Sequence, residues 1–275
     1  MPGSALTLLL ASLSIGWSGT VFARRGDAPV HLPATADSAP SIWFRLVPRL
    51  DLYDNSRRIS PHLDPVGYRS TPLDTAAFLE VATDTAGTRT YARCALTDSV
   101  CQWSRSVESP GALAERYPED VFQVVVRADD TYVGFLQELL GTPFVLLPRH
   151  LPEGHQTDLR VGGDCAALAA YGRRRMGEDI PYQGPRGLFA HLLPVPYGRM
   201  RTGDILHYGE QVQVVFEDRG RKGFSDPEDL VIQSWHPWPR IVSRDSSGWE
   251  GRPFRVFRFR ADAPTDSNPE WSNPR

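Results

Sequence analysis

The stretch that most constrains this chain is Gly162-Gly163-Asp164-Cys165 and the alanine-rich run after it. Ala166 to Ala170 favour a helix, and Gly177 is typical of the position just after a helix end. Arg173 to Arg175 suit the last turn, where the helix dipole favours cations. The pattern predicts a helix that begins at Cys165, where unpaired backbone N–H groups can lower the pKa of a thiol.

This arrangement predicts a sulfur nucleophile, and a second interpretation stays open. Cys165 can instead be a small buried thiol that packs at the start of a helix. Asp164 is predicted to be the N-cap residue of the same helix.

Length and charge limit the classes of protein that the chain can belong to. Its 275 residues suit one large domain or two modest ones. The net charge of −3 and the lack of a basic stripe with interleaved aromatic residues give no sign of nucleic-acid binding. No set of His, Cys and Asp residues has zinc-ligand spacing, so we expect neither a metal nor a cofactor.

Residues 1–23 resemble a signal peptide, with an apolar run from Ala5 to Trp17 and small residues near Ala23. The segment before the apolar run lacks Lys and Arg, which departs from the usual pattern. The run is too short for a stable membrane span. We therefore expect export to the periplasm or the extracellular space, with cleavage near Ala23 and a linker over residues 24–41.

The three cysteines fit an exported protein. Cys94 and Cys101 are close enough in sequence for a hairpin or loop to bring them within disulfide range. Cys165 is then the odd thiol, which is either reactive or a partner for another chain. The alternative is a cytosolic protein with three reduced cysteines.

The order of the elements predicts an α+β protein. Residues 42–127 contain several short apolar or alternating runs, of which Val121 to Val126 is the strongest, and predict a small β-rich domain. Residues 128–261 contain a helix after Asp129-Asp130-Thr131, the helix at Cys165, and then several strands. Residues 262–275 are polar and are predicted to form a flexible tail.

Three short motifs in this second part resemble the NlpC/P60 family of cysteine peptidases. They are Leu140-Gly141-Thr142-Pro143-Phe144, Asp164-Cys165-Ala166-Ala167 and Thr202-Gly203-Asp204-Ile205-Leu206. The resemblance covers about Tyr132 to Phe259. It implies a papain-like domain, with a helix, a helix that carries Cys165 and an antiparallel sheet, that cleaves peptides of the bacterial cell wall. It also implies that Asp164 can bind a substrate amine.

The chain departs from the family where the catalytic histidine should be. That position is Gln211, and a glutamine cannot take a proton from a thiol. The third, orienting residue of the family corresponds to Gln233, and His236 follows it closely enough to be considered as the base. In a two-residue hairpin Tyr208 pairs with Gln211, which places His207 on the opposite face. If Gln211 faces Cys165, His207 should not.

Three functions therefore compete. The first is a secreted thiol hydrolase, a peptidase or amidase, in which Cys165 attacks a cell-wall peptide and His236, Gln211 and Gln233 complete the site. The second is a catalytically inactive NlpC/P60-like protein that binds a cell-wall peptide or a protein partner. The third is a transglutaminase-like fold, although its His-Ala-Trp-like strand is missing. In each case we expect a monomer that binds a peptide, no nucleic acid and no stable membrane span.

Overall fold

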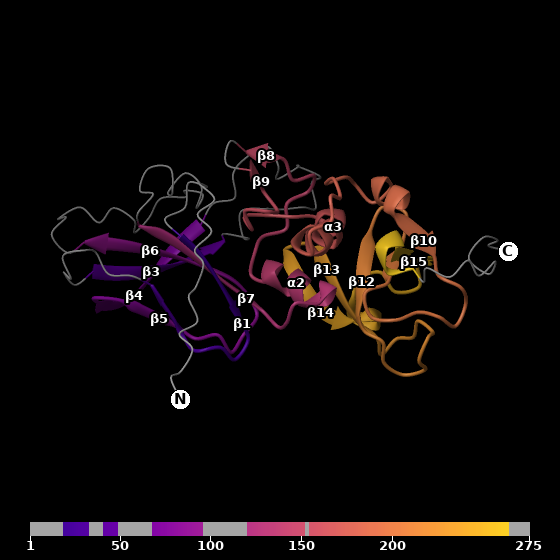
Figure 1. The fold of residues 1–275 in the computed structure, drawn as a ribbon, viewed down its shortest axis with the longest axis horizontal. Helices are drawn as coiled ribbons and strands as arrows, with labels where there is room; N and C mark the ends of the chain where they lie inside the picture. The colour runs from indigo at the N-terminus through magenta and orange to yellow at the C-terminus, as the bar shows by residue number, and fades with distance from the viewer. Residues whose placement is uncertain (1–18, 33–40, 49–67, 96–119, 152–153, 264–275) are drawn as a thin grey trace, which may run out of the picture.

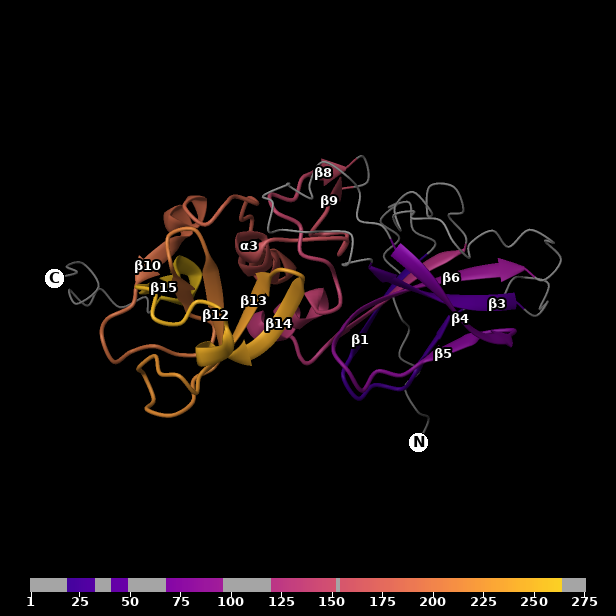
Figure 2. The same ribbon diagram turned by 180° about the vertical axis from the view of Figure 1, so that it is seen from behind.

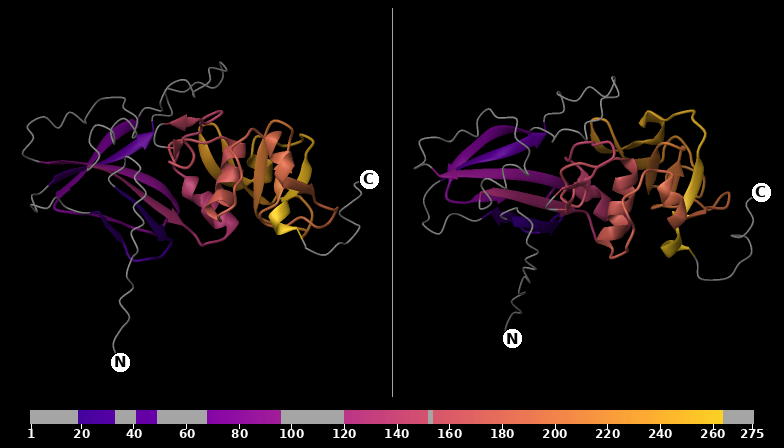
Figure 3. Two further views of the ribbon diagram at one scale, coloured as in Figure 1. Left: turned by 45° about the horizontal axis from the view of Figure 1, so that its top comes forward. Right: turned by 90° about the horizontal axis from the view of Figure 1, so that it is seen from above.

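The computed structural model describes residues 19–32, 41–48, 68–95, 120–151 and 154–263 (Figure 1). Two sheets stand at opposite ends of an elongated molecule, and the helices α2 (Tyr132–Leu136) and α3 (Cys165–Arg175) lie between them (Figures 1 and 2). The prediction of an α+β fold is confirmed for the described residues. The views from above and from the tilted side show the same order of sheet, helices and sheet (Figure 3).

The first sheet is built mainly from the region predicted to be β-rich. Its strand order is β1-β7-β6-β3-β4, in which β1 runs parallel to β7 and the other neighbours are antiparallel. The strands β2 and β5 come from the same part of the chain and form a separate two-stranded sheet. The bounds are β1 Gly19–Arg24, β2 Val30–Leu32, β3 Ser41–Pro48, β4 Tyr68–Ala76, β5 Leu79–Val81, β6 Gly87–Ala95 and β7 Val121–Arg127.

Strand β1 changes the interpretation of the N-terminal segment. Residues Gly19 to Arg24 pair with β7 along their whole length, and Ala23 is buried. Cleavage near Ala23, as the sequence predicts, would remove most of this strand. A short apolar run such as Val21-Phe22-Ala23 suits both the end of a signal peptide and an edge strand, and the long-range pairing with β7 distinguishes the two. Residues 1–18 lie outside the described residues, so export stays a prediction.

The predicted linker over residues 24–41 also contains ordered structure. Val30–Leu32 forms β2, which pairs with Leu79–Val81 in β5, and Ser41 begins β3. Leu32 is fully buried in a cluster with Trp43 and Val124. We call the strands β1 to β7 the first lobe and residues 132–263 the second lobe. This part of the chain therefore belongs to the core of the first lobe. The proline and alanine residues around this strand predict a linker, and a strand of only three residues is too short to alter that prediction.

The second sheet is antiparallel and follows α3 in the chain. Its order is β10-β15-β11-β12-β13-β14, and a separate small pair is formed by β8 and β9. The bounds are α2 Tyr132–Leu136, β8 His150–Leu151, β9 Gly154–His155, α3 Cys165–Arg175, β10 Leu192–Pro194, β11 Ile205–His207, β12 Val212–Glu217, β13 Leu230–Trp235, β14 Trp238–Ser243 and β15 Arg255–Phe259. Short 3-10 turns lie at Gln137–Leu139, Gly187–His191, Arg244–Ser246 and Arg260–Asp262.

The strands before residue 128 do not share a sheet with β11 and β12, as the sequence predicts. Hydrogen bonds nevertheless join the two lobes: Thr88 donates from its amide to Leu140 O (2.8 Å) and from its hydroxyl to Glu138 O (2.6 Å). Val145 also packs into a cluster of the first lobe with Phe44 and Val121. Independent folding of the two lobes stays a prediction.

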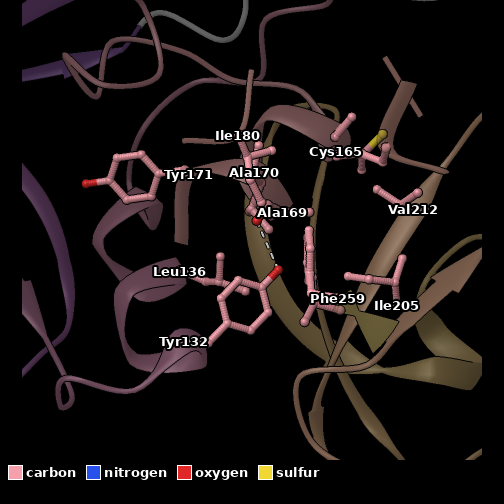
Figure 4. Packing of buried hydrophobic residues seen from close by; sticks show 14 of the residues in the cluster. Tyr132, Leu136, Cys165, Ala169, Ala170, Tyr171, Ile180, Ile205, Val212 and Phe259 are labelled. Atoms are coloured by element: carbon pink, nitrogen blue, oxygen red, sulfur yellow. Dashed lines mark hydrogen bonds between the residues drawn. The ribbon is translucent and has the colours of Figure 1, made fainter. Parts of the chain in front are cut away.

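Helix α3 forms the centre of the second lobe. Its alanines pack on one face of the second sheet together with Ile205, Val214 and Ile232. Figure 4 shows Ala169, Ala170 and Ile205 in this core. The hydroxyl of Tyr132 in α2 donates to Ala169 O at 3.0 Å, which holds α2 against α3 (Figure 4). The small side chains of α3 allow this close approach from both sides. The core of the lobe therefore depends on the run that follows Cys165.

Candidate functional site

Cys165 is the first residue of α3, as the sequence predicts. The Oδ1 atom of Asp164 accepts a hydrogen bond from the amide of Ala167 at 2.8 Å, which makes Asp164 the N-cap residue. The helix ends at Arg175, and Gly177 follows with a φ of 92°. Local capping rules therefore placed both ends of this helix correctly.

Asp164 has a second structural partner. Its Oδ2 atom accepts from the amide of Leu147 at 3.1 Å, where the backbone has the unusual φ of 53°. Burial raises the pKa of this carboxyl, and the hydrogen bonds from backbone amides oppose that rise. Both oxygens are thus used within the fold, one for the N-cap of α3 and the other for the loop at Leu147. The role of Asp164 in binding a substrate amine stays a prediction.

The environment of the Cys165 sulfur differs from the expectation of a readily ionised thiol. Cys165 is a free cysteine that is only 5% exposed, and it packs beside Val212 (Figure 4). Burial and the charge of Asp164 raise the pKa of the thiol well above its ordinary range. Hydrogen bonds from the amides of Val212 and Ala166 lower it by less. The prediction of a lowered pKa is therefore wrong for this structure, because desolvation outweighs the helix terminus.

The register of β12 determines which side chains approach Cys165. Val212 and Val214 belong to the same apolar cluster as Cys165 and the alanines of α3. Alternate residues of a strand point to opposite faces, so Gln213 points to the face away from α3. On that far face Gln213 accepts a hydrogen bond from the hydroxyl of Tyr208 at 3.1 Å.

Gln211 belongs to a buried network of carboxamides on the far face. Gln213 Nε2 donates to Gln233 Oε1 at 2.9 Å, and Gln211 Nε2 reaches the same oxygen at 3.5 Å. Gln233 Nε2 in turn donates to Ser247 O at 2.7 Å. All three glutamines are at most 1% exposed.

This network corrects the predicted arrangement of the site. Gln211 and Gln233 lie together, as expected, but Val212 rather than Gln211 lies beside the sulfur of Cys165. The prediction placed the odd-numbered residues of β12 toward α3, whereas the even-numbered ones face it. An offset of one residue moves every side chain of a strand to the other side of the sheet. The catalytic assignment of the two glutamines stays a prediction.

The same register places His207 on the face of Val212. The two residues are cross-strand partners, and His207 is buried. Its Nδ1 atom accepts from the amide of Gly209 (3.0 Å), so Nε2 carries the proton and donates to Pro185 O (2.9 Å). Burial lowers the pKa of this imidazole. The pairing of His207 with Val212 is confirmed. His207 was expected to lie on the face away from Cys165, but that expectation assumed that Gln211 faces the sulfur.

His236 lies between β13 and β14 and is half-buried. The neighbouring Pro237 accepts a hydrogen bond from the amide of Phe144 at 2.9 Å, and Phe144 pairs with Gly163 just before Cys165. The hairpin that carries His236 therefore contacts the segment that leads into α3. Its assignment as the base stays a prediction.

The structure describes only one of the two cysteines predicted to be bridged. Cys94 is buried in β6, where it pairs with Ile42. Cys101 lies outside the described residues, so the Cys94–Cys101 disulfide stays a prediction.

A histidine that the sequence did not place forms a second buried polar group. His155 stacks on Tyr182 with ring centroids 3.8 Å apart, and its Nε2 atom lies 3.0 Å from Pro148 O. The hydroxyl of Tyr182 donates to Asp158, which also accepts from Arg174. Burial lowers the pKa of His155 to about 4. No sequence motif marks this group, because its members come from β9, from loops and from α3.

Comparison of the chain with protein-family models, curated proteins and solved structures finds no match. Within the described part of the chain, no group of three or more His, Cys, Asp and Glu residues is arranged to hold a metal ion. Over the same residues, no helix has both the length and the apolar character needed to cross a membrane.

Proposed function

We propose that this protein is a catalytically inactive, NlpC/P60-like protein of papain-like fold that binds a peptide of the bacterial cell wall. The observation that carries the proposal is the position of Cys165, whose sulfur is buried beside Val212 with a raised pKa. A thiol must ionise to act as a nucleophile, and this environment favours its neutral form.

The glutamine network supports the loss of catalysis. The residue in the place of the catalytic histidine, Gln211, donates to Gln233 inside a satisfied set of hydrogen bonds. A carboxamide in such a network stabilises the sheet but accepts no proton. The order of α2, α3 and an antiparallel sheet supports the fold assignment, together with the three sequence motifs.

A thiol hydrolase is the second candidate, and one contact favours it. The hairpin with His236 meets the lead-in to Cys165 through the bond between Phe144 N and Pro237 O. His236 is on this hairpin, and catalytic hydrogen bonds often tighten only with substrate bound. In that function Cys165 forms an acyl-enzyme, which water then hydrolyses.

A labelling experiment separates the two functions. The full chain and its Cys165→Ala variant are treated with iodoacetamide at pH 7.5, with and without urea. We expect slow modification of Cys165 in the folded protein and fast modification in urea, because the folded thiol is buried and neutral. Fast labelling without urea, abolished by Cys165→Ala, would instead favour the hydrolase.

Binding and turnover are measured on the same samples with a soluble cell-wall stem peptide. The proposal expects heat of binding by calorimetry in the parent and in Cys165→Ala, with no cleaved product by mass spectrometry. Cleavage that disappears in Cys165→Ala and in His236→Gln would contradict the proposal and establish the hydrolase. An absence of both binding and cleavage would reject cell-wall peptides as the ligand.

A further inference from the structure

A hollow of about 290 Å³ opens at the end of the β11–β12 hairpin, on the side of β15. It touches the glutamine network through Tyr208, which donates to Gln213, but its lining contains neither Cys165 nor any of the glutamines, and it is not used by the proposed function. Its lining residues are Phe189, His207, Tyr208, Gly209, Pro253, Phe254, Arg255 and Phe257.

Aromatic rings form most of the lining. Phe189 stacks on His207 with centroids 4.1 Å apart and meets Phe257 edge to face at 5.1 Å. Tyr208 and Phe254 form a second pair, with centroids 5.4 Å apart. Phe189 is 41% exposed, so part of its ring is available for contact with an occupant. The rings are thus arranged to surround a flat apolar group.

His207 contributes an aromatic surface rather than a free polar group. Both of its nitrogens are occupied, one by Gly209 N–H and the other by Pro185 O. Burial lowers the pKa of its imidazole, and the charge of nearby Arg255 lowers it further. The imidazole is therefore neutral at pH 7 and leaves Arg255 as the charged group of the lining.

Arg255 stands at the rim of the hollow and is exposed. Its guanidinium carbon lies 5.1 Å from the ring centroid of Phe257, which holds the side chain over the aromatic lining. Among the described residues no carboxylate forms an ion pair with Arg255. Gly209, with a φ of 93°, leaves the opposite rim open, since a Cβ atom there would meet nothing within 4 Å. The rim therefore combines an accessible positive charge with free entry.

We propose that this hollow binds one aromatic ring that carries a carboxylate. Its volume is close to the lower limit of small-molecule sites, about 300 Å³, which suits a single ring and its substituent. The ring would stack against Phe189 and Phe254, and the carboxylate would pair with Arg255. An aromatic residue at the C-terminus of a peptide and a free aromatic acid share this chemistry.

The test uses three small probes with the full chain. They are N-acetylphenylalanine, its amide, which lacks the negative charge, and N-acetylalanine, which lacks the ring. Binding is followed by saturation-transfer NMR and by amide shifts of Tyr208 and Gly209. We expect N-acetylphenylalanine to bind, the amide to bind about threefold to tenfold more weakly, and N-acetylalanine to give no saturation of its signals.

Two arginine variants locate the charge. Arg255→Gln should weaken N-acetylphenylalanine to the level of the amide, while Arg252→Gln should leave its affinity unchanged. Arg252 lies over Trp249 at 4.7 Å, outside the lining of the hollow. Phe189→Ala should weaken both N-acetylphenylalanine and its amide, because it removes the stacking surface that the two share.

The outcomes decide the proposal and the source of the ligand. Equal affinity for acid and amide, or an unchanged affinity in Arg255→Gln, would overturn it, as would binding of N-acetylalanine equal to that of N-acetylphenylalanine. A pentapeptide that ends in phenylalanine is then compared with the free acid. Tighter binding of the peptide assigns the site to a peptide C-terminus, and equal or weaker binding assigns it to a free aromatic acid.

Discussion

The hydroxyl of Ser234 in β13 donates a hydrogen bond to the backbone carbonyl of Gly163 at 2.6 Å. Ser234 is fully buried, and Gly163 lies two residues before Cys165. This bond ties the second sheet directly to the turn that starts α3. The position of the Cys165 sulfur therefore depends on a contact between residues 71 positions apart.

Replacement of Ser234 by Ala should loosen the start of α3. It removes the shorter of the two hydrogen bonds to a buried carbonyl, which keeps the one from Val145 N at 3.3 Å, so we expect a loss of about 0.5–1.5 kcal/mol in the free energy of unfolding, measured in urea. Iodoacetamide should also modify Cys165 faster in the folded variant. Ser243→Ala is the control, because that hydroxyl bonds Asp245 at the surface. Equal labelling rates in the two variants would show that the bond does not protect the thiol.

Gly172 is packed so tightly in α3 that alanine should destabilise the protein. A Cβ atom there would lie 2.6 Å from Leu136 Cδ2 and 2.7 Å from a ring carbon of Tyr132. Alanine normally favours a helix by about 1 kcal/mol over glycine, but overpacking costs about 1–3 kcal/mol. We expect Gly172→Ala to lower the melting temperature.

The matched control is Gly184→Ala, since a Cβ atom at Gly184 meets nothing within 4 Å. Its melting temperature should stay close to that of the parent protein. A Gly172→Ala protein at least as stable as the parent would mean that α2 can move away from α3.

His155 should make the protein less stable in mild acid. Its pKa is lowered to about 4 in the folded state, against about 6.5 when unfolded. The unfolded chain binds the proton more readily, so the contribution of His155 is present above pH 6.5 and is lost as the pH falls toward 4. Between pH 7 and pH 5 this predicts a loss of about 2 kcal/mol.

Urea unfolding at pH 7 and pH 5 measures this effect. His155→Phe keeps a ring beside Tyr182 but cannot be protonated, so its stability should change less with pH than that of the parent. His31→Phe is the control, because the side chain of His31 is exposed and lies in β2. The same pH dependence in all three proteins would assign the effect to other groups.

Glu138 should be important for the junction between the lobes. Its fully buried carboxylate accepts from Arg175 Nε at 2.9 Å and from the hydroxyl of Tyr171, and Arg127 of β7 lies 3.6 Å away. Glu138→Gln keeps the shape but removes the counter-charge of Arg175, whereas Arg127 keeps Asp130 at 2.6 Å. We expect a loss of about 2–4 kcal/mol in urea unfolding.

The comparison variant for this prediction is Glu178→Gln. Glu178 pairs with Arg173 at 3.3 Å and is partly exposed, so the loss should stay below about 1 kcal/mol. Similar losses in the two variants would show that burial of Glu138 adds nothing to its ion pairs.

Local rules predicted the elements of the second lobe well. Asp164 and Gly177 mark the two ends of α3, because caps depend on residues only a few positions apart. Thr131 caps α2 by accepting from the amide of Gly134 at 3.1 Å, for the same reason. The pairing of His207 with Val212 followed from the short hairpin.

Very short strands were harder to predict. Val30–Leu32 in β2 is too short to show a period, and it becomes a strand only because β5 lies opposite. Gly19–Arg24 in β1 reads equally well as the end of a signal peptide until β7 is placed beside it. Both depend on distant partners, since Leu32 and Leu79 are 47 positions apart in the chain and Gly19 and Phe122 are 103 positions apart.

The residues around Cys165 are enough to predict that it begins a helix and that Asp164 caps it, because capping and helix propensity act within one turn. The reactivity of the thiol depends instead on how the elements pack. Helix α3 packs on the face of the sheet that carries Val212, which buries the sulfur and leaves Gln211 on the other face. The alternation of a strand offers two faces of equal local energy, and the choice between them is made by long-range packing.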